Sequence, residues 1–126
     1  MVWTLFEYLY RDADNHKAFG QVALAGRASP ETWHRAFQKL DDGRYFIAEQ
    51  LGLPSLCGRL YRWDQASPTD ADHCWHEYVS VSILEDHDLP AAILQFGEIK
   101  AFIELLSGIE TWNIFLSPNV RKPSRT

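Results

Sequence analysis

Two short segments of the chain hold most of the side chains that could do chemistry. The first places carboxylates, imidazoles, a thiol and an indole within eight residues, Asp70-Ala71-Asp72-His73-Cys74-Trp75-His76-Glu77. The second is a polar run at the end of an apolar stretch, from Tyr8 to Lys17. Small proteins often place a site where polar side chains follow a strand. These two segments are therefore the candidate site.

Metal binding is the first chemistry that the histidines suggest. His73 and His76, with the neighbouring carboxylates and thiol, are residue types that zinc prefers. Their order is His-x-x-His-Glu, which is not the His-Glu-x-x-His motif of zinc proteases. On a strand, which the flanking residues favour, the two imidazoles point in opposite directions. We expect neither a metal site nor a cofactor.

Nucleophilic catalysis is the second chemistry that these residues suggest. Cys74 could serve as a thiol nucleophile with His73 as its base, but sequence neighbours on a strand point apart. The glycines form no phosphate-binding loop, and no nucleophile elbow or kinase signature is present. We assign no catalytic residue, and the sequence leans away from an enzyme.

Glu77 is the most unusual of the candidate side chains. Strand alternation places it between Trp75 and Val79 on an apolar face, where a carboxylate needs a partner. We predict that Glu77 or Asp72 pairs with Arg11 or Lys17. Two interpretations stay open: an ion pair that fixes strand register, or a polar pocket. The candidate binding residues are Tyr8, Tyr10, Arg11, Asp12, Asn15, Lys17, Asp72, His73, Trp75, His76 and Glu77.

Composition limits the kinds of partner. The 126 residues are 46% hydrophobic with a formal charge of −5, which is typical of one globular domain and argues against nucleic-acid binding. No run is long enough to span a membrane. The start of the chain lacks the basic and apolar regions of a signal peptide, and two cysteines make no disulfide framework. We expect a cytoplasmic protein.

The pattern of apolar residues predicts the elements that must position the candidate site. Strands are expected over 2–10, 19–25, 44–47, 74–84 and 111–116, with the second antiparallel to the first. Ser29-Pro30-Glu31 begins a helix of about 30–40, and a second helix is expected over about 98–107. Residues 49–53 are ambiguous, and Pro54-Ser55 is a candidate start of a further short helix.

These elements predict an α+β fold, a two-layer sandwich with a mostly antiparallel sheet of four or five strands and two main helices. We expect a single domain over residues 1–119 and a flexible basic tail over 120–126. In the strand over 74–84, alternation assigns one face to Trp75, Val79, Val81 and Ile83, and the other to His76, Tyr78, Ser80 and Ser82.

Four segments resemble a group of small uncharacterised bacterial proteins. They are Tyr10–Lys17, Phe46–Leu56, Asp72–Glu77 and Trp112–Asn119, and the resemblance extends from Phe6 to Asn119. This chain has Ala48 where the group's Phe-Ile-Pro-Glu-Gln segment has proline. The resemblance implies no activity, but it implies that the four segments belong to one folded unit.

Our first functional hypothesis is a non-enzymatic binding protein whose partner is another protein, such as an immunity, anti-defence or adaptor-type inhibitor. The alternative is a protein or hydrolase that binds a small anionic or nucleotide-like ligand in a pocket formed by the same two segments. A third is a domain that assembles only with itself. The sequence leaves the oligomeric state open.

Overall fold

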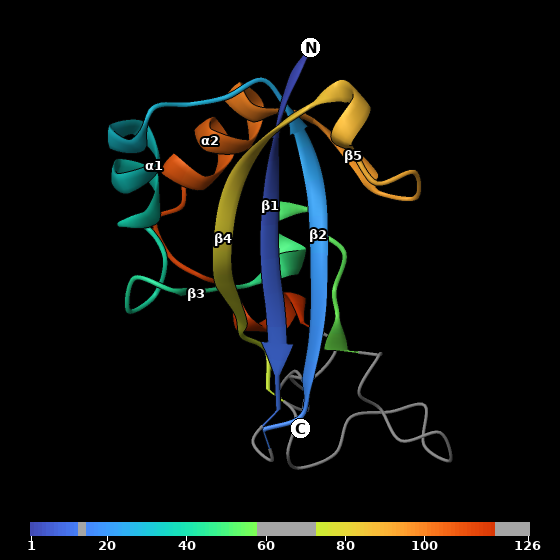
Figure 1. Cartoon of the computed structure of the whole chain (residues 1–126). Helices are drawn as coiled ribbons and strands as arrows, with labels where there is room; N and C mark the ends of the chain where they lie inside the picture. The colour runs from blue at the N-terminus through green and yellow to red at the C-terminus, as the bar shows by residue number, and fades with distance from the viewer. Residues whose placement is uncertain (13–14, 58–72, 118–126) are drawn as a thin grey trace, which may run out of the picture.

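A computed structural model of the chain describes residues 1–12, 15–57 and 73–117 (Figure 1). Its strands are β1 (Val2–Arg11), β2 (Lys17–Ala25), β3 (Tyr45–Phe46), β4 (His76–Glu85) and β5 (Leu94–Glu98). Its α-helices are α1 (Pro30–Phe37) and α2 (Ile99–Ser107). Three 3₁₀ helices complete the described elements: η1 (Ala48–Leu51), η3 (Asp86–Asp88) and η4 (Ile114–Leu116).

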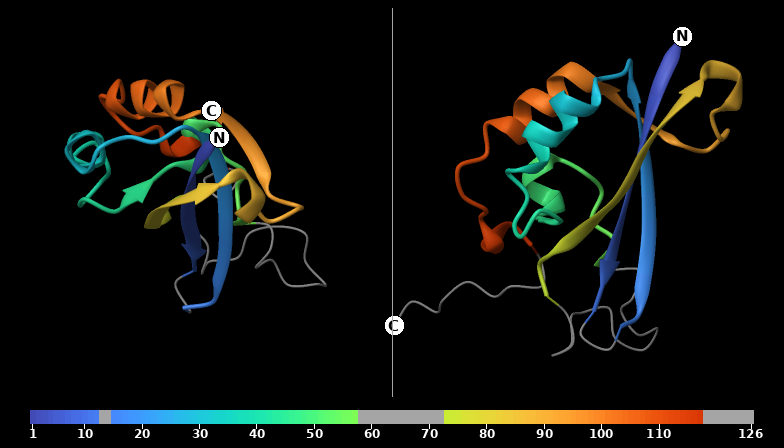
Figure 2. Two further views of the ribbon diagram at one scale, coloured as in Figure 1. Left: turned by 45° about the horizontal axis from the view of Figure 1, so that its top comes forward. Right: turned by 60° about the vertical axis from the view of Figure 1, so that its left-hand side comes forward.

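The strands form one five-stranded sheet in the order β3-β4-β1-β2-β5. All pairs are antiparallel except β2–β5, which is parallel. Both α-helices lie on the same side of the sheet (Figure 2), which confirms the predicted α+β fold with a mostly antiparallel sheet and two main helices. The helices cover the face on which the core is built.

The core is built on alternate residues of the central strand. Phe6, Tyr8 and Tyr10 of β1 are buried against the helical layer, as are Val22 and Leu24 of β2. The intervening residues of β1 are also apolar and buried, namely Trp3, Leu5 and Leu9. The first strand is therefore central in the sheet and apolar on both faces.

A β-bulge corrects the face assignment in β4. The register between β1 and β4 shifts between Glu7 and Tyr8, so that Phe6 lies opposite Val81 and Tyr8 opposite Tyr78. Strict alternation assigned Tyr78 and Val81 to opposite faces, and this was wrong. An extra residue on one strand changes the phase of every side chain beyond it. As a result both Tyr78 and Val81 pack against the core cluster.

The first helix begins as predicted but ends earlier. The Ser29 hydroxyl accepts a hydrogen bond from the Thr32 backbone N–H at 3.2 Å, and Pro30 occupies the first turn. The α-helix ends at Phe37 instead of about residue 40, because the chain tightens into bonds between residues three apart, such as Leu40 N–H to the Phe37 carbonyl. The second helix agrees with its predicted range of 98–107.

Near the end of the chain, one predicted strand was wrong and one strand was missed. The segment expected to be a strand over 111–116 contains η4, whose first turn is capped by the Asn113 side chain. The fifth strand is instead β5, which the sequence did not indicate; it pairs with β2 over a few residues and contains Gly97 at φ +107°. The expected helix near Pro54 lies largely outside the described residues, as does the expected tail over 120–126.

Within residues 1–12, 15–57 and 73–117, no helix is both long and apolar enough to cross a membrane.

Candidate functional site

The pairing of β1 with β4 brings the two polar segments together. In this register Leu9 lies opposite Glu77 and Tyr10 opposite His76, at the end of β1 where β4 begins (Figure 1). The expectation that the segments meet through strand pairing is confirmed. The site that the two segments form has a surface part and a buried part.

Arg11 and Glu77 form the surface part. A guanidinium Nη2 of Arg11 lies 3.5 Å from Oε2 of Glu77, and Nη1 donates to the Asn15 side-chain oxygen at 2.9 Å. The predicted ion pair is confirmed, although Glu77 does not lie on an apolar face with Val79. It stands opposite Leu9, while its neighbours in β4 face the core. The side chains are 39% and 14% exposed, so water screens the pair.

We expect this ion pair to contribute little to stability. Glu77→Gln is expected to lower the free energy of unfolding by less than about 1 kcal/mol, because a long, partly exposed pair gains little over its solvated ions. Urea unfolding of Glu77→Gln, Arg11→Met and the double variant gives the coupling energy directly. A coupling well above about 2 kcal/mol would show instead that the pair behaves as a buried one.

Asp12 closes the loop that presents Arg11. Its carboxylate accepts the His16 backbone N–H at 2.9 Å and lies 3.0 Å from Nδ1 of the His16 ring. Asn15 adopts the left-handed conformation at φ +67°, which asparagine tolerates better than most residues. Asp12 and Asn15 therefore hold the hairpin loop in place.

His73 is held between the two strands. Its backbone N–H donates to the Tyr10 hydroxyl at 2.9 Å, its Nε2 contacts the Arg11 carbonyl, and its Nδ1 accepts the Trp75 N–H at 3.0 Å. These partners assign the proton to Nε2, because a carbonyl only accepts and Nδ1 is already an acceptor. His73 thus ties the backbone of Trp75 to the end of β1.

Tyr8, Tyr10 and His76 belong to the core. His76 is fully buried, and its Nε2 accepts the Leu56 backbone N–H at 3.0 Å. Burial, reinforced by the nearby His73 ring, lowers the pKa of His76 to about 4. Tyr8 donates its hydroxyl proton to the Pro54 carbonyl at 2.6 Å. Tyr8 and His76 therefore hold the segment 54–56 on the sheet.

Cys74 is also unsuited to act as a nucleophile. The residue is buried, and burial raises the pKa of its thiol above the usual value. The nearby carboxylate of Glu49, a residue that the sequence did not single out, raises this pKa further. Both carboxylate oxygens of Glu49 are buried, with no hydrogen-bond partner in the described part of the chain. A thiol that stays protonated is a small apolar side chain.

Two remaining candidates lie apart from this arrangement. Lys17 is exposed on the far strand of the hairpin, opposite Arg11. Asp72 lies outside the described residues.

The surface part of the site lines a shallow cavity of about 380 Å³. Its walls combine residues from both predicted segments with two from the third strand and the turn before it, and they comprise Arg11, Asp12, Asp41, Tyr45, His73, Trp75 and Glu77. Asp41 and Tyr45 were missed. They reach the cavity because Tyr45 pairs with Glu77 across β3 and β4, and Asp41 bridges to Tyr45. The sequence predicted a strand over 44–47, but it did not indicate that this strand pairs with β4 beside Glu77.

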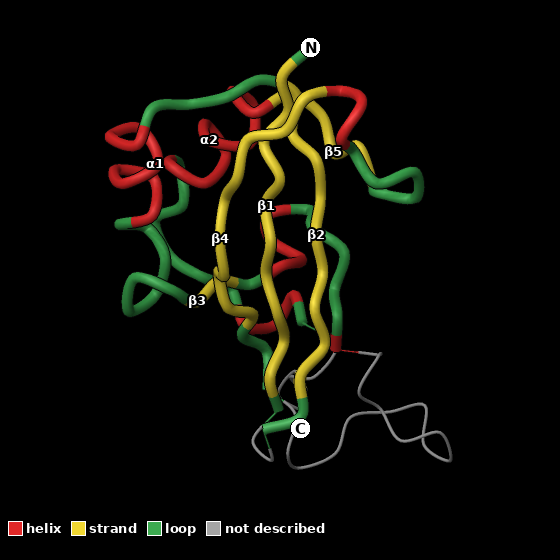
Figure 3. Tube along the Cα trace, in the orientation of Figure 1, coloured by secondary structure: helices red, strands yellow, loops and turns green. Residues whose placement is uncertain are grey.

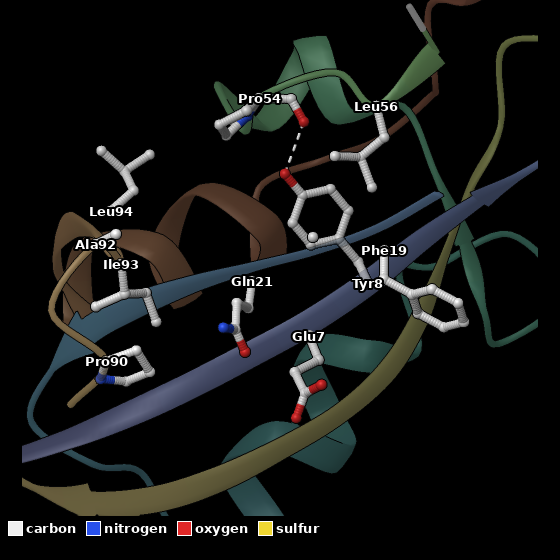
Figure 4. Close-up of a pocket in the computed structure, with 11 residues that line it drawn as sticks. Glu7, Tyr8, Phe19, Gln21, Pro54, Leu56, Pro90, Ala92, Ile93 and Leu94 are labelled. Atoms are coloured by element: carbon white, nitrogen blue, oxygen red, sulfur yellow. Dashed lines mark hydrogen bonds between the residues drawn. The ribbon is translucent and has the colours of Figure 1, made fainter. Parts of the chain in front are cut away.

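A second cavity, of about 540 Å³, lies where β5 separates from β2 (Figure 4). It is bounded by Gly20 and Gln21 of β2, by the Pro54–Leu56 segment and by the chain before β5. Among the described residues of its lining, Glu7 alone carries a charge. Among the described residues, no group of three or more His, Cys, Asp or Glu side chains is placed to hold a metal ion.

No family model matches the chain, and neither the curated proteins nor the solved structures include a significant match.

Proposed function

We propose that this protein is a non-catalytic binding protein that recognises another protein through the cavity between Arg11, Tyr45 and Trp75. In this proposal the partner inserts a basic side chain, arginine or lysine. Such a protein acts by occupying its partner, as immunity, anti-defence and adaptor-type inhibitors do.

The residue types around the cavity carry the proposal. Trp75 and Tyr45 are half-buried, and Arg11 stands beside them with its charge partly exposed. Tryptophan, tyrosine and arginine are the residues that most often dominate the binding energy of protein interfaces. They combine a large rigid surface with a polar tip, which suits an open, shallow cavity better than an enclosed ligand site.

The charges around the cavity indicate the sign of the partner. Among the described residues, three carboxylates line it, those of Asp12, Asp41 and Glu77, against one guanidinium, that of Arg11. Arg11 is already engaged by Glu77 and Asn15, which leaves Asp41 exposed at the rim. A cation placed there meets a carboxylate and an aromatic face together. The net charge of −5 favours approach to a basic partner.

The same charges disfavour the alternative of a small anionic ligand. An anion in this cavity would have to displace Glu77 from Arg11 and remain close to two further carboxylates, which is electrostatically costly. The buried state of His76 and Cys74 likewise supports binding over acid–base or nucleophilic chemistry.

The test uses two blocked tripeptides, Gly-Arg-Gly and Gly-Glu-Gly, titrated into the ¹⁵N-labelled protein. We expect the arginine peptide to produce saturable amide shifts at Tyr45 and Trp75, and the glutamate peptide to produce none. Trp75→Ala is expected to weaken binding at least about tenfold, as for an aromatic hot spot. Asp41→Asn, an isosteric change of an exposed side chain, is expected to weaken it too.

Asp88→Asn provides the matched control, because Asp88 is an exposed carboxylate beyond the far end of β4. It is expected to bind the arginine peptide as the wild type does. Equal shifts with both peptides, or none with either, would refute the proposal. Saturable binding of adenosine monophosphate at Trp75 would favour the anionic-ligand alternative instead.

A further inference from the structure

We propose that the open edge of β4 binds a second copy of this chain, so that two sheets join antiparallel across a two-fold axis. This surface is separate from the cavity described above and does not depend on it.

Among the residues that the structure describes, no strand pairs with the outer edge of β4 beyond its first residues. β3 pairs with β4 only at His76 and Glu77, and the Tyr78 N–H donates to the Arg44 carbonyl at 2.8 Å; Figure 3 shows β3 beside the lower part of β4 alone. On the inner side, Asp86 N–H donates to the Met1 carbonyl at 3.1 Å. Because antiparallel pairs alternate, the backbone groups of Val81, Ile83 and Glu85 point outward.

Two β-branched apolar side chains of β4 are exposed. Ile83 is 54% exposed and Val79 is 41% exposed. Val81 and Ile83 also line a groove of about 420 Å³ between β4 and α1, whose other wall includes Trp33 and Phe37. Among the described residues, no backbone partner is found for the outward-facing groups of Ile83 and Glu85. An edge that combines such groups with β-branched side chains is a template for another strand.

The positions of the charges favour a second copy as that strand. Glu85, Asp86 and Asp88 cluster at one end of the open edge, and Arg44 stands at the other, where β3 begins. In an antiparallel pair of β4 strands, each acidic end meets the other copy's Arg44. We align the two β4 strands so that outward-facing residues pair with one another and the pairing stops at Tyr78, whose N–H is already bonded to Arg44. The longest overlap of the two strands then places the two-fold axis at Ser82. Val81 then lies opposite Ile83 of the second copy, and Glu85 opposite Val79.

Forming this pair requires one local exchange. The Tyr78 phenol hydrogen-bonds the Val81 backbone in the single chain. In the dimer that amide would donate to the carbonyl of Ile83 of the second copy, and the phenol would turn toward the groove. The apolar side chains of the second copy would cover the same groove from the β4 side.

Sedimentation velocity of the full chain over a concentration series tests the proposal. We expect a reversible species of twice the chain's mass, which Ile83→Lys abolishes by placing an ammonium in the apolar pairing. Leu105→Lys is the matched control, because Leu105 of α2 is 46% exposed and lies on another element. It is expected to dimerise as the wild type does, and circular dichroism of both variants establishes that they fold.

A charge exchange tests the register. Arg44→Glu is expected to raise the dissociation constant about tenfold, because the two-fold axis makes each substitution count twice, and Glu85→Arg is expected to do the same. The double variant is expected to recover wild-type affinity. A monomeric wild type, a dimer that survives Ile83→Lys, or a double variant weaker than either single one would each overturn this assignment.

Discussion

Replacing Phe6 by alanine is expected to lower the free energy of unfolding by about 3–5 kcal/mol, a large share of what a domain of this size possesses. Phe6 is 1% exposed in the central strand. Its ring lies 5.2–6.5 Å, centroid to centroid, from the rings of Tyr8, Trp33, Phe46, Tyr78 and Phe102. These partners come from two further strands and both helices, so the cavity left by the substitution would loosen both layers at once.

Urea unfolding followed by tryptophan fluorescence measures this effect. Phe115→Ala is the matched control, because the same side chain is removed from an exposed position of η4. That variant is expected to stay within about 0.5 kcal/mol of the wild type. If Phe6→Ala lost no more than the control, the aromatic cluster would not be the centre of the core.

His76 is expected to make the protein less stable in acid. Its pKa is about 4 in the folded protein, against 6.5 for the free side chain. Between these pH values His76 is protonated in the unfolded chain but neutral in the folded chain. The free energy of unfolding therefore rises with pH across this window. The contribution is complete above pH 6.5, is lost progressively as the pH falls toward 4, and amounts to roughly 3 kcal/mol.

His76→Gln separates this titration from those of the carboxylates. The glutamine amide can still accept the Leu56 N–H, but it takes up no proton. Thermal or urea unfolding at a series of pH values should give a wild type whose stability falls relative to the variant between pH 6.5 and 4. His87→Gln, at an exposed imidazole, should follow the wild type throughout. Parallel curves for the wild type and His76→Gln would show that His76 is not the group responsible.

The parts of the fold that the sequence predicts correctly are those with a local signal. Ser29 and Pro30 mark the start of α1 through the cap itself, and the β1–β2 hairpin has a polar turn between two apolar runs. The strand β5 has only a weak signal, since the alternation of Leu94, Gln95 and Phe96 is short and ends at Gly97, and its partner β2 lies some seventy residues earlier. The β-bulge in β4 could not be predicted from the sequence either, because it depends on which residues of β1 lie opposite β4.

The candidate site shows the same division. Arg11, Trp75 and Glu77 were identified because each lies in a short segment rich in charged and aromatic residues. The pairing of β1 with β4 brings these two segments together in space. His76 and Tyr10 carried the same chemical signal but turn into the core. Residue type alone does not show which face of the sheet a side chain points to. That face decides whether an imidazole contacts water or a backbone N–H in the core.

The place of β1 at the centre of the sheet has a consequence for how the chain is made. β1 and β2 leave the ribosome before β4, which covers the other edge of β1 and begins only at residue 76. Synthesis of residues 26 to 75 takes about 3–10 s at cellular rates of translation. During those seconds the nascent hairpin has two uncovered edges and apolar side chains on both faces. We therefore expect the hairpin to be the part of the nascent chain that is most exposed to aggregation during translation.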